Sequence, residues 1–206
     1  MPGALVTFEG IDQAGKQTQV QAVQERLRVR GVTCARRYYP DYDTPIGKLI
    51  QDALVQGTPL AARARTMLFA ANRWECDAHM RELLAANAGV LVDRYSWSNV
   101  VYGLAQGYDE AWLRALEAGL VEADLTVFVD IPPEESRRRK SHHRDGFERD
   151  VALLDNARAH YLRLARQPGW AVVDGMQAPA AVTEAILRAL ERHLGTRFPQ
   201  LATLRA

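Results

Sequence analysis

The sequence has few cysteines, and they are not arranged for chemistry. Only Cys34 and Cys76 occur among the 206 residues. They lie far apart and lack neighbours spaced as metal ligands, which excludes a cysteine-based metal centre. The pair is typical of reduced thiols in a cytosolic protein, although a single disulfide between them stays open.

Charge of one sign and long apolar runs are also missing. Lys and Arg number 26 against 25 Asp and Glu, so the net charge gives no argument for nucleic acid or an anionic membrane as partner. The N-terminus has no basic segment followed by a cleavable apolar stretch, and no apolar run approaches about 18 residues. We therefore expect a cytoplasmic protein with no membrane partner.

Strand-like and helix-like segments alternate along the chain. The alternation predicts an α/β fold in three layers, with about five strands in a parallel sheet and helices on both faces. A chain of 206 residues suits one domain, 1–206, with a small lid. The expected strands are 4–8, 32–39, 90–93, 125–131 and 170–173. The expected helices are 17–30, 46–55, 60–87 with a bend, 96–105, 110–121, 134–140, 147–166 and 178–194.

The stretch 4–19, ALVTFEGIDQAGKQTQ, carries the most specific pattern. A strand, a glycine-bounded loop ending in Gly-Lys and a helix are what a phosphate-binding loop needs, because backbone N–H groups and the new helix end face the phosphates. The alternative is a chance glycine turn with a surface lysine. The predicted nucleotide-binding residues are Gly10, Ile11, Asp12, Gln13, Ala14, Gly15, Lys16, Gln17 and Thr18.

Three further residue pairs follow predicted strands, namely Tyr39-Pro40, Asp93-Arg94 and Asp174-Gly175. These pairs should gather with the loop, because the carboxyl ends of parallel strands meet at one edge of the sheet. Asp93 can orient Mg²⁺ or its waters, and Arg94 can hold a phosphoryl group by two parallel hydrogen bonds. A structural Asp–Arg pair that caps the next helix is the alternative.

Two helical segments carry groups suited to a nucleobase. Phe69 and Arg73 are four residues apart and share a helix face, so the ring could stack on a base while the guanidinium donates to its edge. Asn99 offers both a donor and an acceptor, and Tyr102 lies on the same face. A core phenylalanine beside a surface arginine, and a helix cap beside a buried tyrosine, are the structural alternatives.

The densest positive run is RRRKSHHR, residues 137–144. A mobile basic segment can close over transferring phosphates, exclude water and stabilise developing charge. A solvated basic helix and a nucleic-acid patch are the alternatives. Aromatic residues do not interleave with the charges, so we expect no nucleic-acid partner. His142 and His143 lack metal-ligand spacing.

Taken together, these residues resemble the thymidylate kinase family, which transfers the γ-phosphoryl of ATP to dTMP. The resemblance runs from Phe8 to about Ala185 and rests on FEGID with the loop, Tyr39-Pro40, LFAANR at 68–73, DRY at 93–95 with Ser98, and Phe147-Glu148. It implies a P-loop kinase fold, ATP and Mg²⁺ as cofactors, and dTMP as the small-molecule substrate. It also implies a homodimer, packed through helices within 46–85, that supplies dTTP for DNA synthesis.

The resemblance implies a role for each matching residue. Asp12 would lie beside the deoxyribose 3′-hydroxyl and the metal, which Asp12 and Asp93 would hold through water. Arg94 would bind the acceptor phosphate. The implied base and sugar contacts are Phe69 stacked on thymine, Arg73, Ser98 and Asn99 at its edge, and Tyr102 against the 2′ position. The implied phosphate and lid residues are Tyr42 near the phosphates, Phe147 over the base and Arg139 near adenine, in a lid at 137–149.

The chain departs from the family pattern at three positions. Some members have an arginine where Asp41 and Tyr42 stand, so that contact is missing or comes from elsewhere, for example Lys48. Some have a loop arginine at the position of Gln13; here the lid, with Arg139 and Arg144, would supply that charge. Gln17 replaces the hydroxyl that binds Mg²⁺. The implied catalytic residues are therefore Lys16, Asp12, Arg94, Asp93, Arg139 and Arg144.

Two other functions stay open. The fold and motifs also suit another nucleoside monophosphate kinase or a deoxynucleoside kinase. Because Gln17 and Asp41 depart from the family pattern, the protein could instead be a nucleotide-binding switch with impaired catalysis.

Overall fold

The computed structural model describes residues 2–55, 59–140 and 151–199. The strands are β1 (Ala4–Glu9), β2 (Cys34–Tyr38), β3 (Gly89–Asp93), β4 (Leu125–Asp130) and β5 (Trp170–Asp174). The helices are α1 (Lys16–Val29), α2 (Pro45–Val55), α3 (Ala62–Glu75), α4 (Asp77–Ala86), α5 (Ser96–Ala105), α6 (Glu110–Glu117), α7 (Pro133–Arg139), α9 (Val151–Leu164) and α10 (Pro179–Leu194).

The five strands form one parallel sheet in the order β2-β3-β1-β4-β5. All six residues of the central strand β1 are buried. Its run ALVTFE does not alternate between apolar and polar residues, as expected of a parallel strand covered on both faces. The predicted α/β fold with a parallel five-stranded sheet is confirmed.

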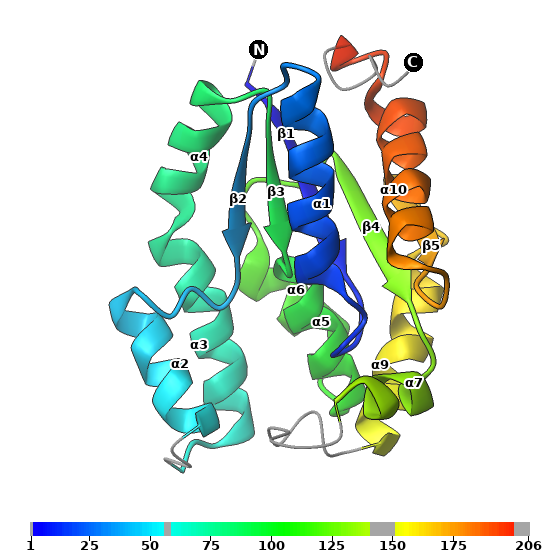
Figure 1. The fold of residues 1–206 in the computed structure, drawn as a ribbon. Coiled ribbons are helices and arrows are strands. Elements are labelled where there is room, and N and C mark those ends of the chain that lie inside the picture. The colour runs from blue at the N-terminus through cyan, green and yellow to red at the C-terminus, as the bar shows by residue number, and fades with distance from the viewer. Residues whose placement is uncertain (1, 56–58, 141–150, 200–206) are drawn as a thin grey trace.

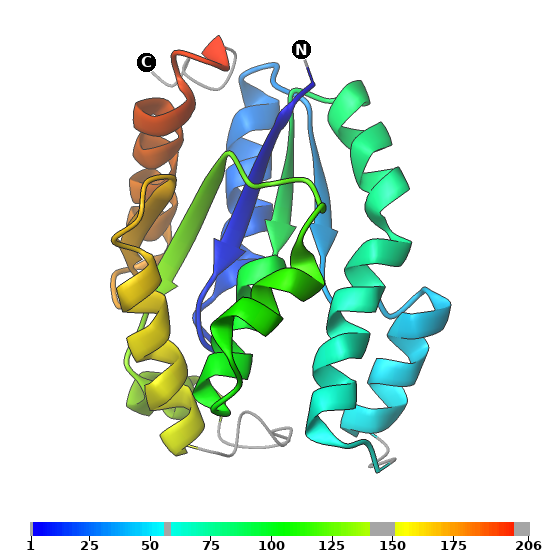
Figure 2. The same cartoon turned by 180° about the vertical axis from the view of Figure 1, so that it is seen from behind.

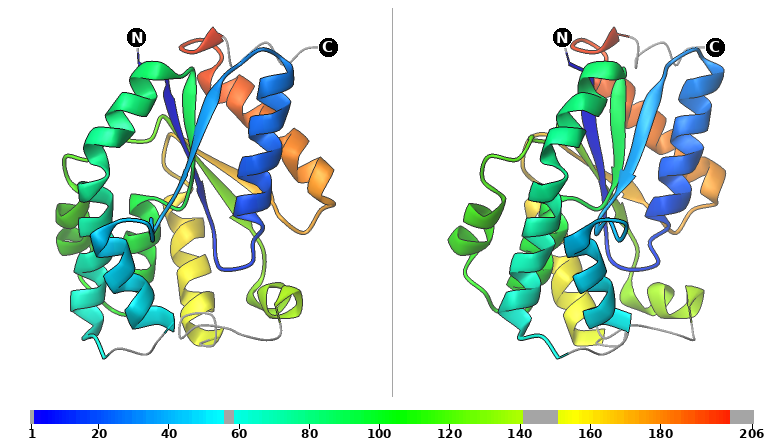
Figure 3. Two further views of the ribbon diagram at one scale, coloured as in Figure 1. Left: turned by 60° about the vertical axis from the view of Figure 1, so that its left-hand side comes forward. Right: turned by 90° about the vertical axis from the view of Figure 1, so that its left-hand side faces the viewer.

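Helices cover both faces of the sheet. Helices α1 and α10 lie side by side over the face shown in Figure 1. Seen from behind, α5, α9 and α4 cover the opposite face (Figure 2). The side views in Figure 3 show the sheet between these two helical layers. Among the described residues, no helix combines the length and apolarity needed to cross a bilayer.

Most element boundaries in the described residues lie within two residues of the sequence prediction, but two elements differ more. The stretch 60–87, predicted as one helix with a bend, forms two helices, α3 and α4, that meet at Cys76. Helix α6 ends at Glu117, short of the predicted residue 121, because Ala118 is extended with a ψ of 122° and Gly119 follows with a φ of 104°. The element following the basic run starts at Val151 in the described part of the chain.

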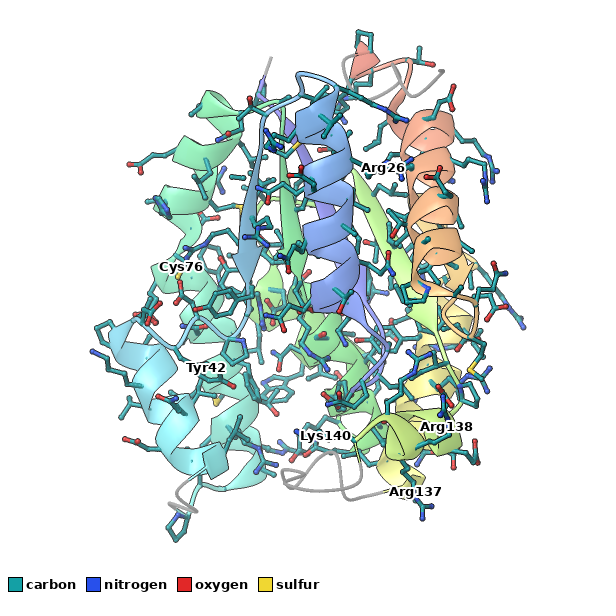
Figure 4. The ribbon with its side chains drawn as sticks, in the orientation of Figure 1. Arg26, Tyr42, Cys76, Arg137, Arg138 and Lys140 are labelled. Carbon is teal, nitrogen blue, oxygen red and sulfur yellow. The ribbon has the colours of Figure 1, made fainter. Side chains whose placement is uncertain are left out.

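The carboxyl ends of the strands all point to one edge of the molecule. In Figure 1 this is the lower end, where the loop before α1, α2, the start of α5 and α7 come together. Figure 4 places Tyr42 beside α2 and Arg137, Arg138 and Lys140 at α7, all toward this same end. The sheet therefore brings the predicted site segments into one region, as the strand-end argument requires.

Candidate active site

The loop between β1 and α1 has the backbone of an anion-binding loop. Gly10 has a φ of 147° and Gly15 a φ of 89°. A Cβ on Gly10 would lie 2.6 Å from the Val129 carbonyl oxygen, so only glycine fits there. No side chain among the described residues caps α1. The first N–H groups of this helix thus face the loop without a side-chain acceptor, as phosphate binding requires.

The Lys16 side chain is buried against the loop in which it would contact a bound phosphate. Its Nζ donates to the Gly10 carbonyl at 3.1 Å and to the Ile11 carbonyl at 2.9 Å. Burial first, and then the nearby Arg94 guanidinium, lower the pKa of Lys16 to about 8, although Asp93, Asp12 and Glu9 act in the opposite direction. An anionic phosphate in the loop would favour the ammonium form and raise this pKa again.

This lowered pKa predicts proton uptake on ATP binding. Below pH 8 Lys16 already carries its proton, whereas above pH 8 the free protein has lost it and the complex must regain it. Calorimetry in buffers of different ionisation enthalpy should show uptake of about half a proton at pH 8 and more above, with ATP affinity falling by up to about tenfold per pH unit. Lys16→Met should abolish the uptake; uptake that persists in this variant would contradict the assignment.

Asp12 joins the loop to the next strand end. Its Oδ1 accepts from Arg94 Nη2 at 2.6 Å, and its Oδ2 accepts from the Tyr102 hydroxyl at 2.6 Å. Burial opposes ionisation of Asp12, but Arg94, then Lys16 and the Tyr102 hydrogen bond, hold its pKa below the usual value. The result is an ionised carboxylate shared between Arg94 and Tyr102.

Asp93 and Arg94 occupy the end of β3. The Arg94 backbone has a φ of 61°, and its N–H donates to the Phe8 carbonyl at 3.0 Å, which fixes this strained turn beside β1. Asp93 Oδ1 is buried and receives no hydrogen bond from the described residues. A buried carboxylate oxygen without a donor fits a Mg²⁺ ion or one of its waters.

Glu9 is a buried carboxylate that the sequence reasoning did not single out. It accepts from the Tyr95 N–H at 2.9 Å, from the Ser98 hydroxyl at 2.6 Å and from the Tyr161 hydroxyl at 2.9 Å. Burial raises its pKa despite these donors. Glu9 thus locks the start of α5 to the end of β1, and Ser98 is held by this carboxylate.

A pocket of about 400 Å³ lies next to the loop. Ten of the predicted residues line it, namely Asp12, Gln17, Tyr42, Phe69, Arg73, Asp93, Arg94, Ser98, Asn99 and Tyr102. The remaining lining residues are Tyr38, Tyr39, Pro40, Leu54, Thr66, Gly103 and Gln106. Thr18 is exposed and lies outside this set. The pocket therefore joins the predicted base-binding residues to those predicted to hold phosphate and metal.

Arg73 and Asn99 share a partner that the sequence did not reveal. Glu117, on α6, accepts from Arg73 Nε at 2.8 Å and from Asn99 Nδ2 at 2.7 Å, and it also pairs with Arg73 Nη2. The Glu117 partnership raises the pKa of Arg73 although burial opposes it. A glutamate at a buried position of an amphipathic helix was the one available signal.

Arg139 crosses from α7 to the loop. Its Nη1 donates to the Gln13 carbonyl at 3.2 Å, its Nη2 donates to the Gly175 carbonyl at 2.7 Å, and its Nε pairs with Glu135 at 2.7 Å. This arginine therefore lies beside the predicted nucleotide-binding loop. The predicted lid residues Arg144 and Phe147 lie outside the described residues.

Asp41 serves as an anchor in this structure. Its N–H donates to Asn72 Oδ1 at 2.7 Å, and its buried carboxylate pairs with Arg37. Lys48, the suggested substitute for the absent arginine, is exposed and is not among the pocket-lining residues. Arg94 and Arg73 are thus the two arginines that line this pocket among the described residues.

Comparisons with known proteins agree with this geometry. The family model described as thymidylate kinase matches residues 8–186. The chain is 36% identical to a thymidylate kinase of Dictyostelium discoideum over 71% of this chain and 67% of that protein. It is 29% identical to the human thymidylate kinase over 94% and 96% of the two chains. A solved thymidylate kinase from Candida albicans superposes with a TM-score of 0.82 at 28% identity, covering 93% of this chain and 92% of that one. The chain belongs to the thymidylate kinase family.

Proposed function

We propose that this ATP-dependent dTMP kinase binds dTMP in the 400 Å³ pocket and ATP over the loop before α1. One observation carries the proposal: Asp12, Gln17, Asp93 and Arg94 belong both to the pocket wall and to the surroundings of the loop. A monophosphate bound in the pocket would therefore present its phosphate to the nucleotide held by Lys16.

Phosphoryl transfer between two phosphates depends on alignment and neutralisation of charge. Lys16 and the loop N–H groups would hold the donor phosphates, and Arg94 would leave Asp12 in part to hold the acceptor phosphate. The acceptor is already an anionic oxygen, so no strong general base is needed. Arg139, which contacts the Gln13 carbonyl, would bring positive charge to the loop where Gln13 lacks it.

We also propose a Mg²⁺ site at Asp93, with Asp12 contributing through water. The buried Asp93 Oδ1 without a donor supports it, and among the described residues no cluster of three or more acidic, histidine or cysteine side chains exists that could hold a metal alone. This suits Mg²⁺, which is usually held by one or two carboxylates, waters and substrate phosphates. When bound, the ion would neutralise charge on the transferring phosphates.

The activity test is turnover across a panel of acceptors with ATP as donor. We expect dTMP to be phosphorylated with a kcat/KM roughly tenfold or more above that for CMP, UMP or thymidine. A better rate with UMP or CMP would favour another monophosphate kinase, and a better rate with thymidine a nucleoside kinase. ATP binding without turnover of any acceptor would favour the switch.

Several further expectations stay predictions. These are the single domain over 1–206, the cytoplasmic location, the homodimer and the absence of a nucleic-acid partner. Leu49 on α2 and Met67 and Trp74 on α3 are exposed apolar side chains that support the homodimer prediction. Sedimentation of the purified protein would test it.

A further inference from the structure

Glu117 stands behind the pocket wall without lining it. The described residues that line the pocket include Arg73 and Asn99 but not Glu117. The Glu117 side chain is nevertheless buried, with 6% of its surface exposed. Its Oε1 receives hydrogen bonds from both Arg73 Nη2 and Asn99 Nδ2. One carboxylate therefore orients two pocket residues from different helices.

The orientation of the Asn99 amide follows from its partners. Its nitrogen donates to Glu117 Oε1 at 2.7 Å and to the Thr66 carbonyl at 3.2 Å. A carboxylate and a backbone carbonyl only accept, so the NH₂ group, not the oxygen, must face them, and both of its hydrogens are used. Asn99 Oδ1 receives no hydrogen bond within the part of the chain that the structure describes. Asn99 thus offers the pocket an acceptor.

Arg73 is constrained in the opposite sense. Glu117 accepts from its Nε–H and from one Nη2–H, which leaves the two hydrogens of Nη1 and the second hydrogen of Nη2 as donors for a ligand. A guanidinium only donates. The wall therefore presents a donating group, Arg73, from α3 and an accepting oxygen, Asn99 Oδ1, from α5, and the same carboxylate fixes both.

We propose that Glu117 is a positioning residue that selects the pyrimidine by fixing the polarity of this donor–acceptor pair. Thymine and uracil present an O4 acceptor beside an N3–H donor, which complements Arg73 and Asn99 as they are held. Cytosine presents an amino donor at position 4 beside an unprotonated N3 acceptor, so that both contacts are mismatched. The inference rests on the proposed function, because it places the base of the acceptor nucleotide at Arg73 and Asn99.

Glu117→Gln changes this polarity while keeping the size of the side chain. A glutamine has one oxygen and one NH₂ group, so it cannot accept from Arg73 Nε, Arg73 Nη2 and Asn99 Nδ2 together. When its NH₂ group faces Asn99, the oxygen of Asn99 becomes the better partner. The two orientations of the Asn99 amide then approach each other in free energy, and the pocket no longer offers a fixed acceptor.

The test compares kcat/KM for dTMP, dUMP and dCMP at saturating ATP. In Glu117→Gln we expect the values for dTMP and dUMP to fall together by roughly ten- to a hundredfold, with dCMP losing much less, so that the dTMP-to-dCMP ratio falls by roughly tenfold or more. Glu117→Asp keeps a carboxylate and should retain the ratio. Glu110→Gln, on the same helix but paired with the exposed Arg114 and Arg163, is the matched control and should behave as wild type.

The outcomes separate the inference from the activity itself. An equal loss for all three nucleotides, with the ratio unchanged, would mean that Glu117 acts on structure alone and would overturn the inference. A wild-type protein that turns over none of the three would count against the proposed function. If Glu117→Gln does not fold, N3-methyl-dTMP tests the same acceptor in folded protein. The methyl group should cost the wild type activity but not Asn99→Ala, and equal penalties in both would overturn the inference.

Discussion

Lys16→Ala is expected to lower kcat by roughly a thousandfold or more, because we propose that the ammonium holds the β- and γ-phosphates of ATP. The fold should survive. The pKa of Lys16 is about 8 in the native protein and 10.5 in the unfolded chain, so at pH 7 the protonated lysine lowers the free energy of unfolding. Lys16→Ala removes this destabilising contribution. Steady-state kinetics and a thermal melt would measure both effects.

The matched control for Lys16→Ala lies on the same helix. Arg28→Ala also removes one cation from α1, but Arg28 is exposed and pairs only with Glu25 among the described residues. We expect wild-type kinetics from it. If Lys16→Ala were to keep wild-type kcat, the assignment of Lys16 to the donor phosphates would be wrong.

Arg94→Ala should lower kcat/KM for dTMP by roughly three to five decades, the range seen when an arginine is removed from transferring phosphates. Arg94 is the pocket arginine next to the loop, and its loss also leaves Asp12 without its ion-pair partner. The affinity for ATP alone, measured by calorimetry, should change little, since Lys16 and the loop remain in place.

Arg94→Lys separates charge from geometry. A lysine keeps the positive charge but cannot form two parallel hydrogen bonds, so partial recovery is expected. Arg81→Ala, an exposed arginine paired with Asp77 on α4, is the control. A dTMP kcat/KM near that of the wild type in Arg94→Ala would remove Arg94 from the acceptor site.

The fold was predictable because its signals are local. Runs such as ALVTFE in β1 and LTVFVD in β4 are apolar enough to require cover on both faces, and the intervening helices follow from periodicity. The end of α6 differs from the prediction because it depends on the extended backbone of Ala118 and the positive φ of Gly119. The neighbouring residues in the sequence do not determine these backbone angles.

Residues of the candidate site could be named from the sequence where they follow a strand or match the family motifs. Asp12, Arg94 and Tyr102 were named from the sequence, and the structure joins them through the two oxygens of Asp12. Glu117 could not be found this way. It acts through Arg73, which is 44 residues away, and Asn99, which is 18 residues away, so only the packing of α6 against α3 and α5 reveals it.

Asp41 shows a second limit of sequence reasoning. In the sequence, Asp41 stands where some members of the family have an arginine, which indicates only that a contact is absent. The structure instead reveals what is present, a carboxylate that pairs with Arg37 while its backbone N–H donates to Asn72. A departure from a pattern shows that a contact is lost, whereas the replacement depends on neighbours that are distant in the chain.

Glu9 has a consequence for how the protein is made. Its carboxylate belongs to β1, yet its donors lie far along the chain, on Tyr95, Ser98 and Tyr161, which follow 86, 89 and 152 residues later. A nascent chain therefore carries the loop after β1 well before it contains all the donors to this carboxylate, because the Tyr161 hydroxyl is added only once α9 has left the ribosome. Because closing such a long loop is slow, the nucleotide loop gains its full support only late in biogenesis. Chains truncated before α9 would then contain the entire loop sequence but lack the Tyr161 hydrogen bond to the Glu9 carboxylate that precedes it.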